Sequence, residues 1–383
     1  MDKAHTHTPR TFAQAAAALA DASARGEPVR IAGACTKRDW GAPGAQCSVT
    51  LRTTGLARIV EHNPGDLTAR LEAGVTLEAA QSALRGAGQM LALDPPAAPD
   101  GTQPTIGGIL ATADCGPLSH RYGSPRELVL GITFALSDGT IASSGGRVIK
   151  NVAGYDLGRL LCGSFGTLGA ILAVNLRLHP LPRAATTTVA TTGDPASLAA
   201  AAAALAAAGL ELDALDVRWH DGAGAVLARA SGPECLRRAR RAARLLAQRG
   251  LGDARTVHDD EPIWEAQRAG QRAAGADAVV RVAARPSALA AVIEAARACS
   301  GSLVGRAALG ISHVRLQADA VGALRERLPD GCWATLRDAP AQTRASLGAW
   351  PEPPRAALEL MRRLKQRFDP AGILNPGVFA GGI

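Results

Sequence analysis

The stretch of the chain that decides the fold is Pro28-Val29-Arg30-Ile31-Ala32-Gly33-Ala34-Cys35-Thr36-Lys37. Residues 28–32 form a short, largely apolar run typical of a strand, and the small residues at 33–36 indicate a turn directly after it. An alanine-rich helix is expected just before this strand, at residues 14–24. Small side chains in such a turn let backbone N–H groups approach an anion such as a pyrophosphate. This segment therefore predicts an α/β unit with an anion site at a strand end.

Two further glycine-rich turns, Thr105-Ile106-Gly107-Gly108 and Gly163-Ser164-Phe165-Gly166-Thr167-Leu168-Gly169, also lie next to strand-like runs. Neither has the spacing of a P-loop or of a dinucleotide fingerprint between a strand and a helix, which disfavours both classes. A glycine turn alone serves local geometry more often than a ligand, so the three turns matter as a set. Strands are expected at 59–62, 68–73, 128–136, 140–143 and 170–178. A helix capped by Thr76 is expected before Gly86 and Gly88, and an irregular functional loop at 94–116.

The residue composition of the sequence changes near residue 183. Helical patterns rich in Ala and Arg at 196–208, 235–249 and 287–298 alternate with strand-like runs at 214–219, 278–283 and 312–316. This alternation predicts a helix-covered antiparallel sheet and an overall α+β class. The arginines at 237–249 have helical spacing, which favours a solvated helix face over a phosphate site.

The amino-acid composition argues against several classes of protein. The chain has 383 residues, 47% of them apolar, and a net charge of +8 from 42 basic and 34 acidic side chains. With five Phe, five Trp and two Tyr there is little to stack on bases, so a nucleic-acid binder is not expected. Seven cysteines without a C-x-x-C disfavour a disulfide framework, a zinc ribbon and an iron–sulfur cluster.

No secretory or membrane-spanning segment is expected. The N-terminal residues are not followed by an apolar run, and the longest apolar stretch, 196–210, is mostly alanine and shorter than the ~20 apolar residues of a membrane span. These features predict a cytoplasmic protein, with peripheral attachment to the inner membrane through partner subunits as an alternative.

Scarce residue types gather in a few short segments. Both tyrosines, Tyr122 and Tyr155, and two of the four lysines, Lys37 and Lys150, fall in or near the candidate segments, as do Asn151 and Asn375. The residues alone leave two interpretations open for the segment around 150–156. In the first, Tyr155 is a core aromatic residue and Lys150 is a surface charge. In the second, both residues belong to a ligand site.

The order of these segments resembles the FAD domain of the p-cresol methylhydroxylase-type (PCMH-type) flavoproteins, the vanillyl-alcohol oxidase superfamily. The phrase Lys150-Asn151-Val152-Ala153-Gly154-Tyr155-Asp156-Leu157 narrows the resemblance to the FAD-binding subunits of glycolate oxidases. The resemblance covers residues 25–182, and the tail Arg367-Phe368-Asp369-Pro370-Ala371-Gly372-Ile373-Leu374-Asn375-Pro376-Gly377 is similar to the family's C-terminal return to the flavin. Between residues 184 and 360 the resemblance rests only on the length of the segment and its pattern of helix-like and strand-like runs.

The resemblance implies a two-subdomain α/β FAD-binding domain at 1–183, an α+β cap domain with an antiparallel sheet at 184–365, and a returning C-terminal segment at 366–383. It places residues 33–37 on the pyrophosphate, 105–112 beside the pyrophosphate and ring system, 150–156 near the flavin and 166–171 at the adenosine end. The candidate FAD-binding residues are Gly33, Ala34, Cys35, Thr36, Lys37, Thr105, Ile106, Gly107, Gly108, Ala111, Thr112, Tyr122, Gly123, Lys150, Asn151, Gly154, Tyr155, Asp156, Gly166, Thr167, Gly169, Ile171 and Asn375.

Histidine positions bear on covalent attachment and on metal binding. The first turn has no histidine, so FAD is expected to bind without a covalent link, and His120 is not expected to form one either. The cap histidines His220, His258 and His313 are far apart in sequence, and the acidic residues after His258, at 259–261, are expected to form an exposed turn. No metal site is expected, and no catalytic residue is assigned.

The function that the resemblance implies is that of an FAD-binding subunit in a multi-subunit glycolate oxidase. This assembly oxidises glycolate to glyoxylate by hydride transfer to FAD. A homologous catalytic flavoprotein subunit and an iron–sulfur subunit are the expected partners, and the lone chain is not expected to turn over glycolate. Two alternatives remain: a free-standing FAD-linked dehydrogenase or oxidase of another 2-hydroxy acid or a sugar alcohol, and a non-catalytic scaffold subunit.

Overall fold

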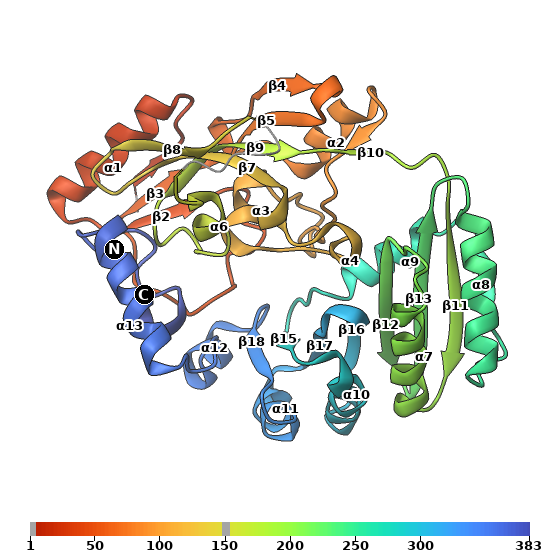
Figure 1. Cartoon of the computed structure of the whole chain (residues 1–383). Helices are drawn as coiled ribbons and strands as arrows, with labels where there is room; N and C mark the ends of the chain where they lie inside the picture. Colours follow the sequence, from red (N-terminus) through yellow and green to blue (C-terminus); the bar gives the residue numbers. More distant parts are fainter. Residues whose placement is uncertain (1–4, 148–153) are drawn as a thin grey trace. The chain divides into compact units, whose positions relative to one another are not determined.

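The computed structural model describes residues 5–147 and 154–383, and the chain forms two compact units (Figure 1). The first unit comprises Met1–Cys115, Gly123–Leu181 and Glu352–Ile383, and the second comprises Gly116–Tyr122 and Pro182–Pro351. The expected division at 183 and 365 differs from these units at two places. Residues 116–122 group with the second unit, and the returning C-terminal segment begins at 352.

The first unit has a five-stranded antiparallel sheet of order β4-β5-β9-β7-β8 and a three-stranded parallel sheet of order β1-β3-β2. Its elements are β1 (His5–His7), α1 (Phe12–Arg25), β2 (Val29–Ala32), β3 (Val49–Arg52), β4 (Ile59–Asn63), β5 (Thr68–Glu72), α2 (Leu77–Arg85), β6 (Gln89–Met90), α3 (Ile106–Thr112), α5 (Pro125–Leu128), β7 (Val129–Ala135), β8 (Ile141–Gly145), α6 (Leu157–Leu161), β9 (Ala170–Arg177), β10 (His179–Pro180) and α13 (Arg355–Phe368).

Local signals account for most of these boundaries. Helix α1 begins after Thr11, whose side chain accepts a hydrogen bond from Gln14 N, and ends at Gly26 in the left-handed region. Thr76 caps α2 by accepting from Ala79 N, as its position before the helix predicts. The glycines at 107 and 108 were expected in a turn, and this is wrong because they lie in the first turn of α3. Thr105 caps this helix by accepting from Gly108 N.

The C-terminal segment runs beside β2. Val29 N donates to Ile373 O at 2.8 Å, and Asn375 N donates to Val29 O at 2.9 Å. Lys365 on α13 holds this segment in place because its Nζ donates to Thr167 O, to Leu374 O and to Asp369 Oδ2. The last residues of the chain therefore form part of the wall around β2.

The second unit is built on one eight-stranded sheet of order β14-β11-β13-β12-β16-β17-β15-β18. All of its pairings are antiparallel, as the alternation in the second half of the sequence predicts. Its elements are α4 (Ser119–Tyr122), β11 (Ala185–Thr192), α7 (Pro195–Ala207), β12 (Ala214–His220), β13 (Ala223–Ser231), α8 (Cys235–Gln248), β14 (Arg255–Val257), α9 (Glu261–Ala269), β15 (Asp277–Ala283), α10 (Leu289–Ala298), β16 (Ser302–Arg306), β17 (Ile311–Gln317), α11 (Val321–Arg327), β18 (Trp333–Leu336) and α12 (Ala341–Leu347).

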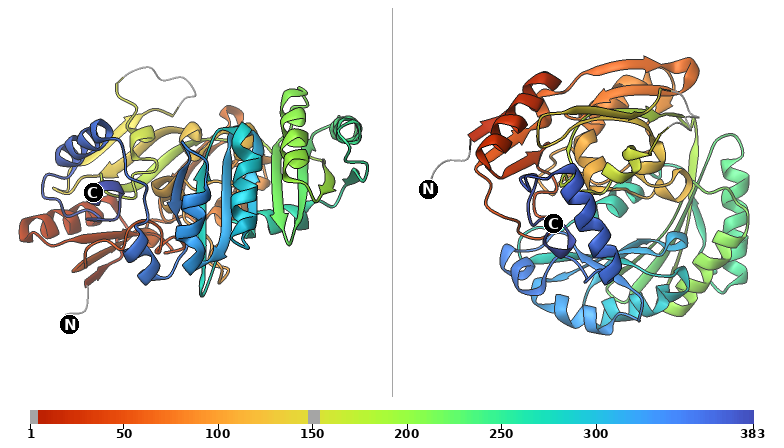
Figure 2. Two further views of the ribbon diagram at one scale, coloured as in Figure 1. Left: turned by 90° about the horizontal axis from the view of Figure 1, so that it is seen from below. Right: turned by 60° about the vertical axis from the view of Figure 1, so that its left-hand side comes forward.

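The two faces of this sheet differ. Helices α7, α8, α10 and α11 follow one face (Figure 2), and the apolar side chains between them and the strands form a continuous core. Helix α9 lies on the other face, where Trp264 packs with Leu227 and Ala225. At the turn into β17, Gly310 has φ +64° and a Cβ there would lie 1.9 Å from Ala284 O, so this tight turn requires glycine.

The exposed arginines of α8 confirm the expected solvated face, since its buried residues are Cys235, Ala239, Ala242 and Leu246. None of the helices in the described part of the chain has the length and apolar character needed to cross a membrane.

Candidate functional site

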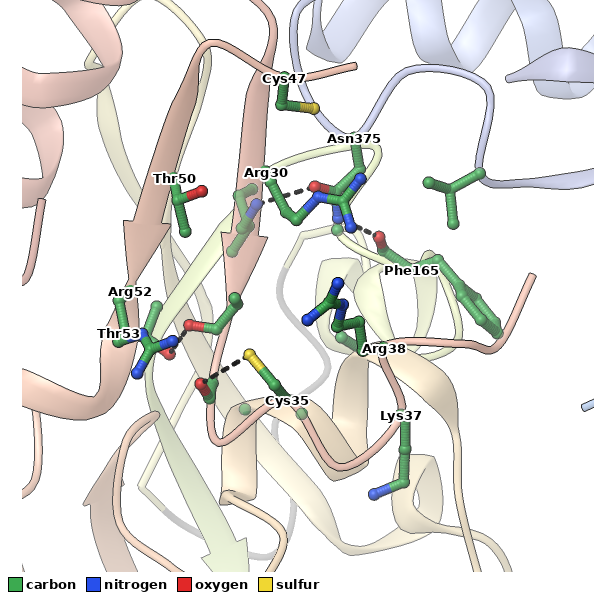
Figure 3. Close-up of a pocket in the computed structure, with 18 of the residues that line it drawn as sticks. Arg30, Cys35, Lys37, Arg38, Cys47, Thr50, Arg52, Thr53, Phe165 and Asn375 are labelled. Atoms are coloured by element: carbon green, nitrogen blue, oxygen red, sulfur yellow. Dashed lines mark hydrogen bonds between the residues drawn. The ribbon is translucent and has the colours of Figure 1, made fainter. Parts of the chain in front are cut away.

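A large cavity opens in the first unit where its glycine-rich segments meet. Its volume is about 1130 Å³, slightly above the ~300–1,000 Å³ typical of small-molecule sites. The turn after β2, helix α3, the segment at 165–171 that leads into β9, and the C-terminal segment all line it (Figure 3). Segments from near the two ends of the sequence therefore form one site.

The turn after β2 presents backbone amides to this cavity. Cys35 has φ +60°, a conformation that turns the chain back at this point, and Ala34 and Cys35 both line the cavity. Their amide N–H groups donate to none of the described residues. Unused amides in a turn that contains a left-handed residue form a concavity that suits an anion. Gly33 is required here because a Cβ at this position would lie 2.2 Å from Thr105 Oγ1.

Asn375 ties two walls of the cavity together. Its Oδ1 accepts a hydrogen bond from Ile31 N at 2.8 Å, and its Nδ2 donates to Phe165 O at 2.6 Å (Figure 3). Gly166 lies against the same side chain, since a Cβ at 166 would lie 2.7 Å from Asn375 Nδ2. Asn375 thus holds β2 and the segment around Phe165 at a fixed spacing.

Basic side chains dominate the charged part of the lining. Arg30, Arg38 and Arg52 line the cavity, against one acidic residue, Glu27. Lys37 also lines it, but its Nζ lies 3.2 Å from Asp114 Oδ2, and both side chains are 5% exposed. Lys37 therefore forms a buried ion pair and supplies less net charge to a ligand than the three arginines do.

The structure brings most of the predicted site residues together. The predicted residues that line the cavity are Gly33, Ala34, Cys35, Thr36, Lys37, Thr105, Gly107, Gly108, Ala111, Thr112, Gly166, Gly169, Ile171 and Asn375. The other predicted residues that the structure describes do not line it, and these are Ile106, Tyr122, Gly123, Gly154, Tyr155, Asp156 and Thr167. Lys150 and Asn151 lie outside the described residues.

The residues that do not line the cavity have other environments. Ile106 is fully buried in the apolar interior. Thr167 donates to Ser164 O within its own turn, and Asp156 caps α6 by accepting from Arg159 N. Tyr155 is 89% exposed, so the interpretation of this side chain as a core aromatic is wrong.

Sequence reasoning missed Arg30, Arg38 and Arg52. Arg30 and Arg52 belong to paired strands, β2 and β3, and Arg38 follows the turn, so no single motif contains all three. The available signal was the position of Arg30 within the quoted strand, two residues from Ala32 on the same side of the pleat.

The acidic turn after His258 also differs from expectation. Asp260 is 4% exposed, accepts from Thr187 Oγ1 at 2.7 Å and pairs with Arg229 at 3.1 Å, so it is a buried structural group. Among the described residues no group of three or more His, Cys, Asp or Glu side chains has an arrangement that holds a metal.

Comparison with protein families defines the class. Residues 4–145 match the FAD binding domain, and residues 352–379 match the C-terminal domain of FAD linked oxidases. Both matched regions contribute residues to the lining of the cavity. Over these residues the chain is similar to the FAD linked oxidases, and FAD is its cofactor.

Individual relatives refine this placement. Over 157 residues the chain is 37% identical to glycolate oxidase subunit GlcE of Escherichia coli, covering 41% of this chain and 44% of that protein. Over 158 residues it is 35% identical to a probable mitochondrial D-lactate dehydrogenase of Danio rerio, covering 40% and 31%. The matched region thus spans less than half the length of either protein.

Two longer similarities extend over the second unit. An uncharacterized FAD-linked oxidoreductase of Mycobacterium tuberculosis is 27% identical over 99% of this chain and 91% of its own length. A solved structure of alkyldihydroxyacetonephosphate synthase superposes with a TM-score of 0.70 and 13% identity over 97% of this chain and 76% of that one. The similarity to the synthase structure shows that the two proteins share a fold.

The residues present fit FAD. Its pyrophosphate is a compact dianion, and the free amides of Ala34 and Cys35 together with the arginines at 30, 38 and 52 are the donor set that such a group needs. The glycines at 107, 108 and 166 all line the cavity. Gly107 itself packs on Ala73, since a Cβ there would lie 2.8 Å from Ala73 Cβ, so Gly108 is the residue of the pair with more open space.

Proposed function

We propose that this chain is an FAD-dependent oxidoreductase of small 2-hydroxy acids and that it works as the FAD-binding subunit of a glycolate oxidase assembly. The observation that carries this proposal is the cavity, in which the predicted pyrophosphate turn, helix α3 and Asn375 converge. The similarity to glycolate oxidase subunit GlcE and to a D-lactate dehydrogenase supports the choice of 2-hydroxy acids.

The residues of the cavity divide the work of holding FAD. The amides of Ala34 and Cys35 and the guanidinium groups of Arg30 and Arg38 would bind the pyrophosphate. Asn375 would act as a positioning residue, because it fixes the spacing between Ile31 and Phe165 on two walls. When bound, FAD accepts the two electrons and the hydrogen that leave the C–H bond of the substrate.

The proposed subunit role is supported by the similarity to the Escherichia coli protein, which is a glycolate oxidase subunit by name. We propose a homologous flavoprotein subunit and an iron–sulfur subunit as the partners. FAD is proposed to bind without a covalent link, because no histidine occupies the turn at 33–37.

A second candidate is a free-standing dehydrogenase of a 2-hydroxy acid. The similarity to a D-lactate dehydrogenase over residues of the first unit favours it. The two candidates differ in what the lone chain does with its substrate.

The first experiment measures flavin. The purified chain, reconstituted with FAD and desalted, is expected to keep stoichiometric flavin absorbance and to release all of it on acid precipitation. A colourless protein after reconstitution would contradict FAD binding, and flavin in the acid pellet would contradict the non-covalent mode.

The second experiment measures turnover. Dye reduction by glycolate is assayed with the lone holoprotein and with the chain co-expressed with its partners. Activity of the assembly alone is expected. Turnover by the lone chain at the ~10 per second typical of enzymes would favour the free-standing dehydrogenase.

A further inference from the structure

The second unit carries basic side chains on the face of β16, β17, β15 and β18 that lies opposite its apolar core. His313 on β17 pairs with Val304 on β16 and with Arg281 on β15, and Arg281 pairs in turn with Thr335 on β18. Directly opposed residues of a sheet share a face. His313 and Arg281 are therefore neighbours in one row across four strands.

Two more arginines extend this row. Arg306 lies two residues beyond Val304, and Arg337 lies two residues beyond Thr335, so both side chains start on the same face. Arg306 is 2% exposed, Arg337 is 7% exposed and His313 is 6% exposed. We call Arg281, Arg306, His313 and Arg337 the basic row.

The electrostatic surroundings of His313 are net positive. Burial and the positive charges of Arg306, Arg281 and Arg337 hold the pKa of His313 well below its ordinary value. The imidazole is therefore neutral at pH 7 and carries one proton.

Arg306 decides which nitrogen carries that proton. Its Nη2 lies 3.3 Å from His313 Nδ1, and a guanidinium group has donors only, so Nδ1 accepts. The proton consequently resides on Nε2. Arg306 is itself held by Gln271 Oε1 at 2.9 Å and by Gly116 O at 3.3 Å, which keeps this tautomer in place.

His313 Nε2 is then an unused donor. It makes no hydrogen bond to any residue that the structure describes, and packing does not seal it off as it does His120 Nδ1. A nitrogen that bears a proton has no lone pair for a metal ion or for proton abstraction, and the flanking arginines repel cations. The chemistry that fits a neutral N–H in a positive field is a compact anion.

We propose that the basic row binds a small carboxylate, with His313 Nε2–H as a neutral donor and Arg281 as the charged partner. Arg281 is half-buried and adjoins His313 in the row, and a guanidinium group matches the two oxygens of a carboxylate. The choice of a carboxylate among compact oxyanions rests on the proposed function, because a 2-hydroxy acid carries this group.

Titration calorimetry of the FAD-loaded protein with glycolate tests this site. Arg281→Met and His313→Phe are each expected to weaken binding about ten- to a hundredfold, the effect of losing a hydrogen bond to a charged group. His313→Gln, whose amide can donate, is expected to recover part of the loss. Arg244→Ala on the exposed face of α8 is the charge-matched control and is expected to bind as the wild type does.

Three outcomes would overturn the site. They are equal binding by the wild type and Arg281→Met, tighter binding of sulfate than of glycolate, and zinc binding that His313→Phe abolishes. Circular dichroism establishes that each variant folds, and Arg281→Met decides the matter if His313→Phe does not fold.

An independent readout is the tautomer of His313. Long-range proton–nitrogen correlation spectra of the imidazole are expected to show the Nε2–H form, perturbed by glycolate. A proton on Nδ1 would contradict the proposal. Glycolate binding that Arg281→Met weakens, together with no dye reduction by the co-expressed assembly, would sustain the site and count against the proposed function. Dye reduction by the assembly, together with equal binding by the wild type and Arg281→Met, would do the reverse.

Discussion

The turn after β2 and the basic row of the second unit are both anion-directed sites, yet they are built in opposite ways. In the turn, contiguous residues supply backbone amides and their small side chains keep the approach open. In the basic row, single residues from separate strands supply side chains, and strand register brings them together. A site built from the backbone amides of contiguous residues can be recognised from a local sequence motif. A site built from side chains on separate strands has no such motif.

The buried ion pairs of the two units sharpen this contrast. Lys37–Asp114 in the first unit lies at the cavity wall, and its lysine also lies 5.7 Å from the ring centroid of Trp40. Arg272–Asp338 in the second unit is bidentate, with N–O distances of 2.7 and 3.1 Å. We expect the first pair to affect the ligand site and the second to affect stability.

The largest effect is expected from Asp338→Ala. Loss of this carboxylate leaves the buried Arg272 without its bidentate partner and Ala273 N without its acceptor, which costs about 3–5 kcal/mol of unfolding free energy. Denaturant unfolding measures the change, with the exposed Asp319→Ala as control. A loss below about 1 kcal/mol would show that the pair is dispensable for stability.

Gly33→Val is expected to have the next largest effect, in the first unit. The new Cβ would lie 2.2 Å from Thr105 Oγ1, so the turn and the cap of α3 must move, at about 1–3 kcal/mol, and FAD is lost. Flavin content after reconstitution measures this. Gly65→Val, where a Cβ meets nothing within 4 Å, is the control. A Gly33→Val protein that keeps full flavin would show that the turn tolerates displacement.

Asn375→Ala tests the link between the two walls of the cavity. It leaves Ile31 N and Phe165 O without their partner, and we expect FAD to bind about ten times more weakly. Flavin fluorescence titration gives the dissociation constant, and Asn63→Ala, outside the cavity lining, is the matched control. An unchanged constant would remove the positioning role from Asn375.

The sequence predicted the first unit well because its signals are local. The strand at 28–32, the turn at 33–36 and the tail with Asn375 each have a motif, and the structure brings them to one cavity. The helix at 106–112 was missed because two glycines in its first turn suggest a turn, while Thr105 and apolar packing of Ile106 and Ile109 stabilise the helix.

In the second unit the sequence predicted individual helices and strands but not the order of the strands in the sheet. Its helices and antiparallel sheet follow from periodicity, but His313, Arg281 and Arg306 meet only once the strand order β16-β17-β15 is known. Asp260 was placed on the surface because acidic residues in a row are usually solvated, and its pairing with Arg229 depends on a strand distant in sequence.

The smallest effect is expected from pH, and it tests whether the basic row is as positive as its residues suggest. Burial and Arg306 lower the pKa of His313 in the folded state. As pH falls below ~6.5, His313 therefore becomes protonated in the unfolded chain while it stays neutral in the folded chain. Stability therefore falls with falling pH in this window, by at most about 1.4 kcal/mol per pH unit for this one group. The pKa of His120 is also lowered by burial, with Asp213 opposing, so it adds to the slope in the same direction.

His313→Gln is expected to flatten the stability profile between pH 6.5 and 5, roughly the range in which an unfolded histidine charges. The control is His220→Gln, which removes a histidine whose side chain is 69% exposed. Chemical unfolding at each pH gives both profiles. If His313→Gln and the control share one slope, then His313 takes up its proton in the folded state as readily as in the unfolded chain, and the field of the basic row is too weak to select an anion.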